Sequence, residues 1–262
     1  MDDLINLDRY PINDPTHPGY ADMISRCQAA LGADGASVLE DFVPEQTINQ
    51  SVTEITPLLG KAFCKTKHHS PYLVADDPAY PPDHPRNRKQ MTNSATLAYD
   101  FIPTRSMLNR LYLCESFRRF LADVLGYEAL YPYADNLTPM NILIYDRGAE
   151  LGWHFDLPPF VVTLTLQQSE AGGDFLFAPF IRSDDDENFD GVDDLLEGRS
   201  DAVRELRQPP GALVVFRGNR TLHRVTPIKG KTPRLAAALS YSKTPGTISD
   251  EHNRMTFYGR EA

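Results

Sequence analysis

The stretch PMNILIYDRGAELGWHFDLPPFVVTLTLQ, residues 139–167, decides the fold because its apolar and polar residues begin to alternate with a period of two. Such alternation is typical of β-strands, whose successive side chains point to opposite faces. More short β-rich runs follow, each bounded by glycine or proline. The expected strands are 141–145, 160–168, 174–180, 212–217, 221–228 and 234–242. Six short strands in succession predict a jelly roll or a small barrel.

Residues 1–138 have mainly helical patterns. Apolar residues at helical spacing predict helices over 20–31, over 53–63 and over 106–125, the last ending at Gly126. Five prolines within 70–88 exclude regular structure over most of that segment, which we interpret as a long loop or lid. We therefore expect one α+β domain over 1–262. In it, 1–138 supplies helical and loop support and a lid, and 139–246 forms a cupin-like jelly-roll core.

Net charge and cysteine content narrow the classes of partner. The formal net charge of −10 and the pI near 5.1 give a surface that repels phosphate backbones and anionic lipids. Neither nucleic acid nor a membrane is expected as a partner, and there is no signal-peptide pattern and no apolar run long enough to span a bilayer. Cys27, Cys64 and Cys114 are odd in number and lack CxxC spacing, so we expect reduced thiols and a cytoplasmic protein.

The acidic run between Asp184 and Glu197 includes apolar residues at helical spacing, from Phe189 to Leu196. This pattern predicts a short amphipathic helix with a solvated acidic face, closed by Gly198.

His154-Phe155-Asp156 places an imidazole and a carboxylate two residues apart. In a strand, or at its end, side chains two residues apart point to the same face, so both groups can converge on one ion. The motif alone is weak, because a chain with seven histidines produces such a triplet by chance. A histidine bonded to a nearby carboxylate at a strand end is the structural alternative.

His223 follows a strand and a glycine turn and begins another strand, a position from which a barrel strand delivers a side chain to the mouth. A lone histidine here is more often structural. Two histidines and one carboxylate together form a facial triad with open coordination positions, which suits iron(II) oxygen chemistry better than a closed zinc site does. We therefore predict that His154, Asp156 and His223 bind a metal.

Arg234 lies eleven residues after His223, beyond the short loop 229–233. A tight connection there would return Arg234 to the barrel interior, where its guanidinium can hold a carboxylate through two hydrogen bonds. An arginine in a barrel interior is costly without an anionic partner, so we predict an anion-binding role. A partly exposed arginine at a strand edge is the alternative.

The order HxD, distal histidine and then arginine, in the second half of a β-rich chain, resembles the iron(II)/2-oxoglutarate-dependent oxygenases, which have a double-stranded β-helix core. More narrowly, the chain is similar to the radical halogenases and hydroxylases of free amino acids. The motifs behind this narrower likeness lie within residues 98–246. They are Leu151-Gly-Trp-His-Phe-Asp156, Gly172-Gly-Asp-Phe175, Asp185-Asp-Glu-Asn-Phe-Asp190, the run from Phe216-Arg-Gly to Leu222-His-Arg-Val-Thr-Pro227, and Leu239-Ser-Tyr241.

This resemblance implies an iron(II)/2-oxoglutarate-dependent dioxygenase. Iron(II) would bind 2-oxoglutarate through its keto acid end, and Arg234 would hold the far carboxylate. Oxygen would cleave the cosubstrate to succinate and carbon dioxide, and the resulting ferryl oxidant would take a hydrogen atom from an unactivated C–H bond. Halogenases of this group have glycine or alanine two residues after the first histidine and bind chloride there, whereas hydroxylases keep a carboxylate. Asp156 therefore favours hydroxylation.

The resemblance also implies a substrate site, in which an arginine from the proline-rich loop binds the substrate α-carboxylate. Arg88, in Asn87-Arg-Lys-Gln90, is the expected match and Arg86 the second choice; a solvated basic run is the alternative for both. Leu157 and the apolar residues after it are expected to rim the site, which favours a neutral or apolar amino acid over a cationic one. In this scheme Asn141 is expected to reach the cosubstrate, and satisfying backbone groups at a strand end is the alternative.

Three further residues near these motifs are assigned lesser roles. Trp153 is expected to point away from the metal and to pack against other side chains. His69 and His84 are expected to be loop residues, with contact to substrate as the alternative.

The sequence leaves several functions open. The leading expectation is hydroxylation of a free amino acid or a similar small molecule. The same cofactors could serve desaturation, cyclisation or attack on a carrier-tethered substrate. A cupin-type ligand-binding jelly roll is the non-enzyme alternative, against which Arg234 argues. A small-molecule substrate is the expected partner, and a homodimer is left open.

Overall fold

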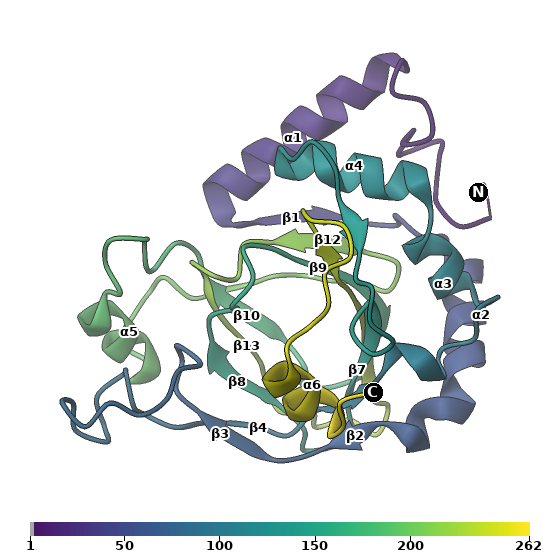
Figure 1. Ribbon diagram of the computed structural model, residues 1–262. Coiled ribbons are helices and arrows are strands. Elements are labelled where there is room, and N and C mark those ends of the chain that lie inside the picture. Colours follow the sequence, from purple (N-terminus) through teal and green to yellow (C-terminus); the bar gives the residue numbers. More distant parts are fainter. Residues whose placement is uncertain (1–2) are drawn as a thin grey trace.

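Two antiparallel β-sheets face each other in the computed structural model, which describes residues 3–262 (Figure 1). The major sheet has seven strands, in the order Ala36–Leu39 (β1), Leu213–Phe216 (β12), Val161–Gln167 (β9), Arg234–Leu239 (β14), Met140–Tyr145 (β7), Ala95–Leu97 (β5) and Phe63–Cys64 (β2). The minor sheet has six, in the order Arg204–Glu205 (β11), Phe175–Ala178 (β10), Leu222–Val225 (β13), Leu151–His154 (β8), Gln90–Thr92 (β4) and Lys67–His69 (β3). Tyr241–Ser242 (β15) pairs separately with Tyr131–Pro132 (β6). This arrangement is the expected jelly roll.

Helices cover the outer face of the major sheet. The α-helices are Pro18–Asp34 (α1), Glu45–Ile55 (α2), Met107–Tyr112 (α3), Glu115–Leu125 (α4), Phe189–Leu196 (α5) and Glu251–Tyr258 (α6); short 3-10 helices span Thr56–Lys61 and Tyr99–Phe101. Figure 1 shows α1, α2, α3 and α4 on one side of the sheet, and α5 and α6 away from them. No helix in the described part of the chain is long and apolar enough to cross a membrane.

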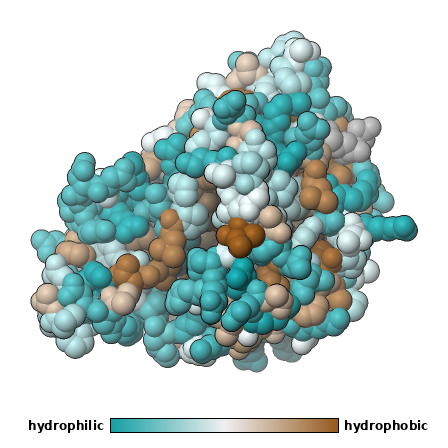
Figure 2. Space-filling model, viewed as in Figure 1, coloured by the Kyte–Doolittle hydropathy of each residue, from teal (hydrophilic) through white to brown (hydrophobic). Residues whose placement is uncertain are grey.

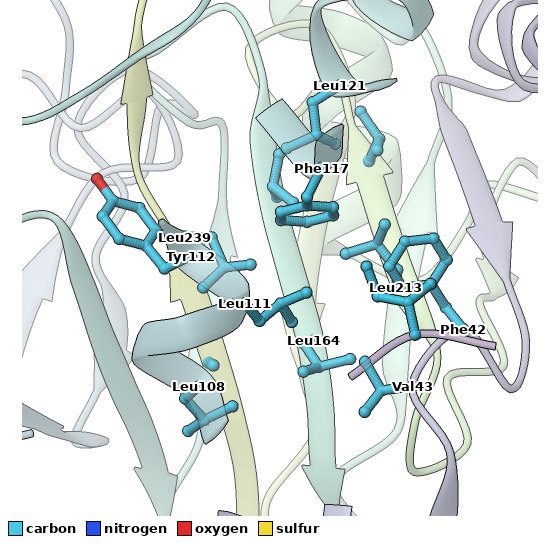
Figure 3. Packing of buried hydrophobic residues seen from close by; sticks show 14 of the residues in the cluster. Phe42, Val43, Leu108, Leu111, Tyr112, Phe117, Leu121, Leu164, Leu213 and Leu239 are labelled. Atoms are coloured by element: carbon cyan, nitrogen blue, oxygen red, sulfur yellow. The ribbon is translucent and has the colours of Figure 1, made fainter. Parts of the chain in front are cut away.

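The main hydrophobic core lies between these helices and the major sheet. Phe117 and Leu121 of α4 pack with Leu164 of β9, Leu213 of β12 and Leu239 of β14 (Figure 3). Because side chains alternate along a strand, the residues between the core positions face the minor sheet. The inner face of the major sheet is therefore free to form a site.

The structure confirms the helix over 20–31 and the acidic helix, and it corrects two other helices. The helix expected over 53–63 begins earlier, at Glu45, and continues after Ile55 as a 3-10 helix. The helix expected over 106–125 is broken at Leu113 and Cys114. The apolar stripe explains the break, because the step from Tyr112 to Phe117 is five residues and cannot stay on one face of a continuous helix.

The jelly roll also extends beyond the expected core of 139–246. β1, β2 and β5 pair into the major sheet, and β3 and β4 pair into the minor sheet, so residues 36–97 contribute strands as well as support. Their short length hides the alternation that revealed the later strands. The proline-rich segment between β3 and β4 contains turns but no regular element, as expected. The strand expected over 234–242 ends at Leu239, and the residues beyond it join the small sheet.

Candidate metal centre

His154 and His223 lie opposite each other on neighbouring strands of the minor sheet. His154 ends β8 and is the register partner of His223 on β13. Their ring centroids are 4.1 Å apart, and only 7% and 4% of their surfaces are exposed. The ring of Phe216, on β12 of the major sheet, is edge-on to His223 at 4.8 Å. The histidines therefore face into the space between the sheets.

Backbone carbonyls fix the tautomer of both histidines. Nδ1 of His154 lies 2.9 Å from the carbonyl oxygen of Gly152, and Nδ1 of His223 lies 2.9 Å from that of Thr221. A carbonyl can only accept, so each Nδ1 carries the proton and each Nε2 keeps its lone pair. Burial, and then His223, lower the pKa of His154, which keeps its ring neutral. A neutral imidazole oriented by such a partner is the form that binds a metal.

Asp156 completes the site from the chain just after β8. Its Oδ1 is 3.5 Å from Nε2 of His154, and its Oδ2 is 3.5 Å from Nε2 of His223. Burial would raise the pKa of this carboxyl group, but the two histidines outweigh burial and lower it. One ligand atom from each residue lies within 4.8 Å of the others. Two imidazole nitrogens and one carboxylate on one side of a point fit a facial metal triad.

Arg234 opens β14 on the facing sheet and is 5% exposed. Its Nη2 donates a hydrogen bond of 2.7 Å to Oε1 of Gln208, and its guanidinium lies 5.5 Å from the ring centroid of Tyr145. No carboxylate among residues 3–262 forms an ion pair with it, and burial lowers its pKa. A buried cation without an anionic partner is costly. The position therefore fits one carboxylate of a bound dicarboxylate.

Thr165, on β9, was missed by sequence reasoning. It is the register partner of Ala236, which shares a face of β14 with Arg234 because the two are two residues apart. Its Oγ1 is buried and has no hydrogen-bond partner within the described residues. Buried hydroxyl groups are normally paired, so this one is available to a ligand beside Arg234.

A cavity of about 430 Å³ reaches Arg234 and Gln208 but is not lined by His154, Asp156 or His223. Phe175 also lines it, and the ring of Phe175 stacks on His223 with centroids 5.4 Å apart. Tyr145 is close enough to both Arg234 and Asp156 to feel their charges. Burial raises the pKa of Tyr145, Arg234 lowers it, and Asp156 raises it further. The arginine end and the metal end thus belong to one interior.

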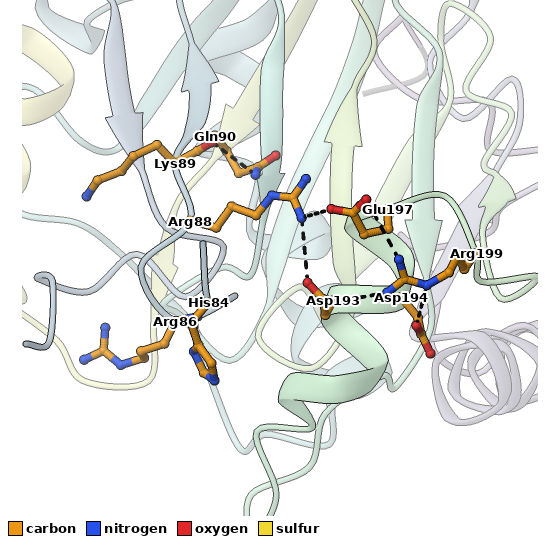
Figure 4. Close-up of polar contacts among 9 residues, drawn as sticks. All are labelled: His84, Arg86, Arg88, Lys89, Gln90, Asp193, Asp194, Glu197 and Arg199. Atoms are coloured by element: carbon orange, nitrogen blue, oxygen red, sulfur yellow. Dashed lines mark hydrogen bonds and ion pairs between the residues drawn. The ribbon is translucent and has the colours of Figure 1, made fainter. Parts of the chain in front are cut away.

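The proline-rich loop is held against α5 by Arg88. Nη1 of Arg88 donates to Oε1 of Glu197 at 2.5 Å and lies 3.7 Å from Oδ1 of Asp193 (Figure 4). Arg86 donates to the carbonyl oxygen of Ala75 and points away from Arg88. In this structure both guanidinium groups have protein partners. The substrate role expected for them stays a prediction, and a substrate carboxylate would have to displace Glu197 from Arg88.

Other expected residues lie around the same interior. Trp153 packs in a cluster with Tyr72 and Val192 of α5, away from the metal, as expected. Leu157 follows Asp156 in the chain and is 62% exposed, so its side chain is accessible to a substrate. Figure 2 shows a largely hydrophilic surface on the face that carries α6, with a few separate apolar patches. Asn141 lies on the inner face of β7, because it is four residues from Tyr145, the register partner of Arg234, and so points to the same side.

Sequence reasoning missed Tyr258, and it expected His69 in a loop although His69 ends strand β3. Tyr258, in α6, accepts a hydrogen bond of 3.2 Å from Nδ2 of Asn141, which places the C-terminal helix beside the interior. His69 lies near the metal ligands, with its ring 6.1 Å from that of His154. Burial lowers the pKa of His69 to about 4, so it is neutral. The pair His68-His69 has no ligand spacing that could have revealed this placement.

Comparison with known proteins agrees with this geometry. The sequence profile of the family Halogenase D (HalD) matches residues 21–257. No curated protein matches the chain. Several hundred solved chains are similar in structure, and three of them are described here.

The first of the three is an oxidoreductase of the 2OG-Fe(II) oxygenase family from Burkholderia pseudomallei, with 14% identity, a TM-score of 0.55, and 86% of this chain and 92% of that chain covered. The second is a prolyl-4-hydroxylase from Pseudomonas putida, with 14% identity, a TM-score of 0.53, and 85% and 100% covered. The third is the epimerase SnoN in complex with Fe3+, α-ketoglutarate and nogalamycin RO, with 13% identity, a TM-score of 0.55, and 84% of both chains covered.

The solved structures share the jelly-roll fold, and the triad and the buried arginine supply the chemistry. Iron fits two imidazoles and a carboxylate with open positions. 2-Oxoglutarate, a dicarboxylate, fits a site with a metal at one end and an unpaired guanidinium at the other. The chain therefore belongs to the Halogenase D (HalD) family and is an iron(II)/2-oxoglutarate-dependent oxygenase.

Proposed function

We propose that this enzyme hydroxylates an unactivated C–H bond of a free amino acid or a similar small molecule. The observation that carries the proposal is the position of the Asp156 carboxylate, whose two oxygens each face the Nε2 of one histidine. A carboxylate held in this way would occupy the third protein position on a bound metal. Its presence favours hydroxylation over halogenation, the two outcomes that the family resemblance allows.

Counting coordination positions gives the reason. Iron(II) in such a site takes about six ligands, of which the facial triad supplies three. A keto acid bound through two oxygens takes two more, and oxygen needs the last. A halide would need a position that a protein ligand leaves open, and with Asp156 on the metal no such position would remain.

The side chains of the interior divide the remaining work. Arg234 and Thr165 would hold the far carboxylate of 2-oxoglutarate, and Gln208 fixes the guanidinium through its hydrogen bond. When bound, iron(II) and 2-oxoglutarate supply the oxidation: the substrate C–H bond and dioxygen yield the alcohol, while the cosubstrate loses carbon dioxide and becomes succinate. His154 keeps its Nε2 lone pair directed at the metal because Gly152 holds its Nδ1 proton.

The surroundings of the triad support a small, uncharged substrate side chain. Leu157 and two prolines follow Asp156, and no acidic side chain lies among these three residues to pair with an ammonium group. Burying an ammonium group against such a rim would be costly. Arg88 and Arg86 remain our candidates for the substrate α-carboxylate, with Arg88 first leaving Glu197.

The test is a panel of amino acids incubated with the enzyme, iron(II), ascorbate, 2-oxoglutarate and chloride, and read by mass. We expect a gain of one oxygen in at least one neutral amino acid, matched by an equal amount of succinate. A chlorinated product would overturn the assignment of Asp156. A loss of two hydrogens would show desaturation or cyclisation instead. Succinate at background with every amino acid would refute the substrate class and favour a carrier-tethered substrate.

A further inference from the structure

Gly218 lies directly against the Asp156 carboxylate, in the loop that follows β12. A Cβ atom built on Gly218 would be 1.7 Å from Oδ2 and 2.6 Å from Cγ of Asp156. Such separations are far below van der Waals contact, so no other residue fits while the carboxylate keeps its place. The space that a side chain would need at position 218 is filled by a metal ligand.

The backbone conformation of Gly218 does not by itself require glycine. Nine glycines of the described chain have a positive φ, and Gly218 is not one of them. An alanine at this position would therefore meet no backbone strain. Contact with the carboxylate is what excludes a side chain here.

The loop cannot relieve that contact easily by moving away. The Asp156 N–H donates to the carbonyl oxygen of Gly218 at 3.0 Å, and the Arg217 N–H donates to that of Gly35 at 2.7 Å. Nε of Arg182 donates to the carbonyl oxygen of Asn219 at 2.7 Å. With the loop tied at three successive residues, rotation of the Asp156 side chain is the cheapest response to a Cβ at position 218.

We propose that Gly218 is a positioning residue for the metal-binding carboxylate: its bare α-carbon forms the wall against which Asp156 is held toward His154 and His223. The proposal rests on the metal site described above. A Gly218→Ala protein should fold, because rotation of the Asp156 side chain is enough to relieve the steric clash. The turned carboxylate no longer faces the histidines, so metal binding suffers while the fold does not.

The test is a double-mutant cycle read by cobalt(II) affinity in anaerobic calorimetry, with Gly218→Ala, Asp156→Ala and the double variant. In the wild-type background we expect Gly218→Ala to weaken cobalt(II) binding at least tenfold, the usual scale for losing ligand orientation. In the Asp156→Ala background the two closest contacts, to Oδ2 and Cγ, are gone and only the 3.0 Å approach to Cβ of residue 156 remains. The same change should then alter the affinity less than twofold. Gly32→Ala, at a helical glycine with nothing within 4 Å of its would-be Cβ, is the control.

The thermal midpoint of the metal-free proteins is the second readout. The double variant should melt no lower than Asp156→Ala alone. Equal affinity losses in both backgrounds, unchanged affinity in Gly218→Ala, or a lower midpoint of the double variant would each overturn the proposal. If wild-type protein binds no cobalt(II), the metal site itself and the function built on it fail; if it binds and Gly218→Ala binds equally well, the role of Gly218 alone fails.

Discussion

Replacing Arg234 by methionine should separate ligand binding from stability. Two charge-assisted hydrogen bonds to a carboxylate, at about 1.5–3 kcal/mol each, give at least about 3 kcal/mol, so the Kd for 2-oxoglutarate should rise about 100-fold or more. The metal-free protein should change little. Removing a 5% exposed guanidinium with no carboxylate partner is favourable, and this gain offsets the roughly 1–3 kcal/mol cost of leaving Gln208 without its donor.

The assay is an anaerobic titration of the iron(II) protein with 2-oxoglutarate, beside urea unfolding of the metal-free protein. Cobalt(II) affinity should stay within about twofold, because Arg234 is not a metal ligand. Arg220→Met is the control, since Arg220 forms an exposed ion pair with Asp184, a type worth about 0–1 kcal/mol. If Arg234→Met lost several kcal/mol of stability while binding 2-oxoglutarate normally, Arg234 would be a structural residue and the cosubstrate site would lie elsewhere.

Three smaller predictions follow from other contacts. Thr165→Val should weaken 2-oxoglutarate binding about tenfold or more. It should leave the metal-free protein as stable as before or more stable, because it removes an unpaired buried hydroxyl group. Lower stability with normal binding would contradict this. Glu170 accepts backbone N–H donors from Lys231 and Thr232, which lower its pKa to about 2. The stability that this carboxylate contributes should therefore be complete above its usual pKa near 4.5 and vanish as the pH falls toward 2. Wild-type protein should be more stable than Glu170→Gln at neutral pH, and this difference should disappear in acid. A difference independent of pH would refute the prediction. Phe117→Ala, at a fully buried ring, should cost about 3–5 kcal/mol in urea unfolding, and a loss under 1 kcal/mol would contradict the core assignment.

The convergence of His154 and Asp156 could be predicted because their spacing is local. His154 and Asp156 are two residues apart at a strand end, and this spacing alone puts both on one side of the chain. His223 was grouped with them because two histidines and one carboxylate form a facial triad, but the strand pairing that makes it the register partner of His154, across 69 residues, is not written in either segment. Arg234 could be placed because a charged residue at the start of an apolar strand needs an explanation.

Contacts that depend on distant segments could not be predicted. Thr165 is an ordinary strand threonine until its register with β14 places it two positions from Arg234. Tyr258 belongs to a helix whose polar sequence gave no core pattern. His69 reaches the centre because its strand, β3, pairs with β4, and β4 pairs with β8. Gly218 resembles any turn glycine, and only the folded loop shows that a carboxylate fills its side-chain space. Each of these depends on tertiary packing, which periodicity does not encode.

The division of the site between two sheets also has a mechanical consequence. The three candidate metal ligands belong to the minor sheet and the chain that extends it, whereas Arg234 and Thr165 belong to the major sheet. A dicarboxylate anchored at both ends is therefore a removable cross-link through the middle of the sandwich. The thermal midpoint of the enzyme should therefore rise with cosubstrate concentration, because a ligand that binds only the folded state stabilises it. It should fall again when succinate leaves.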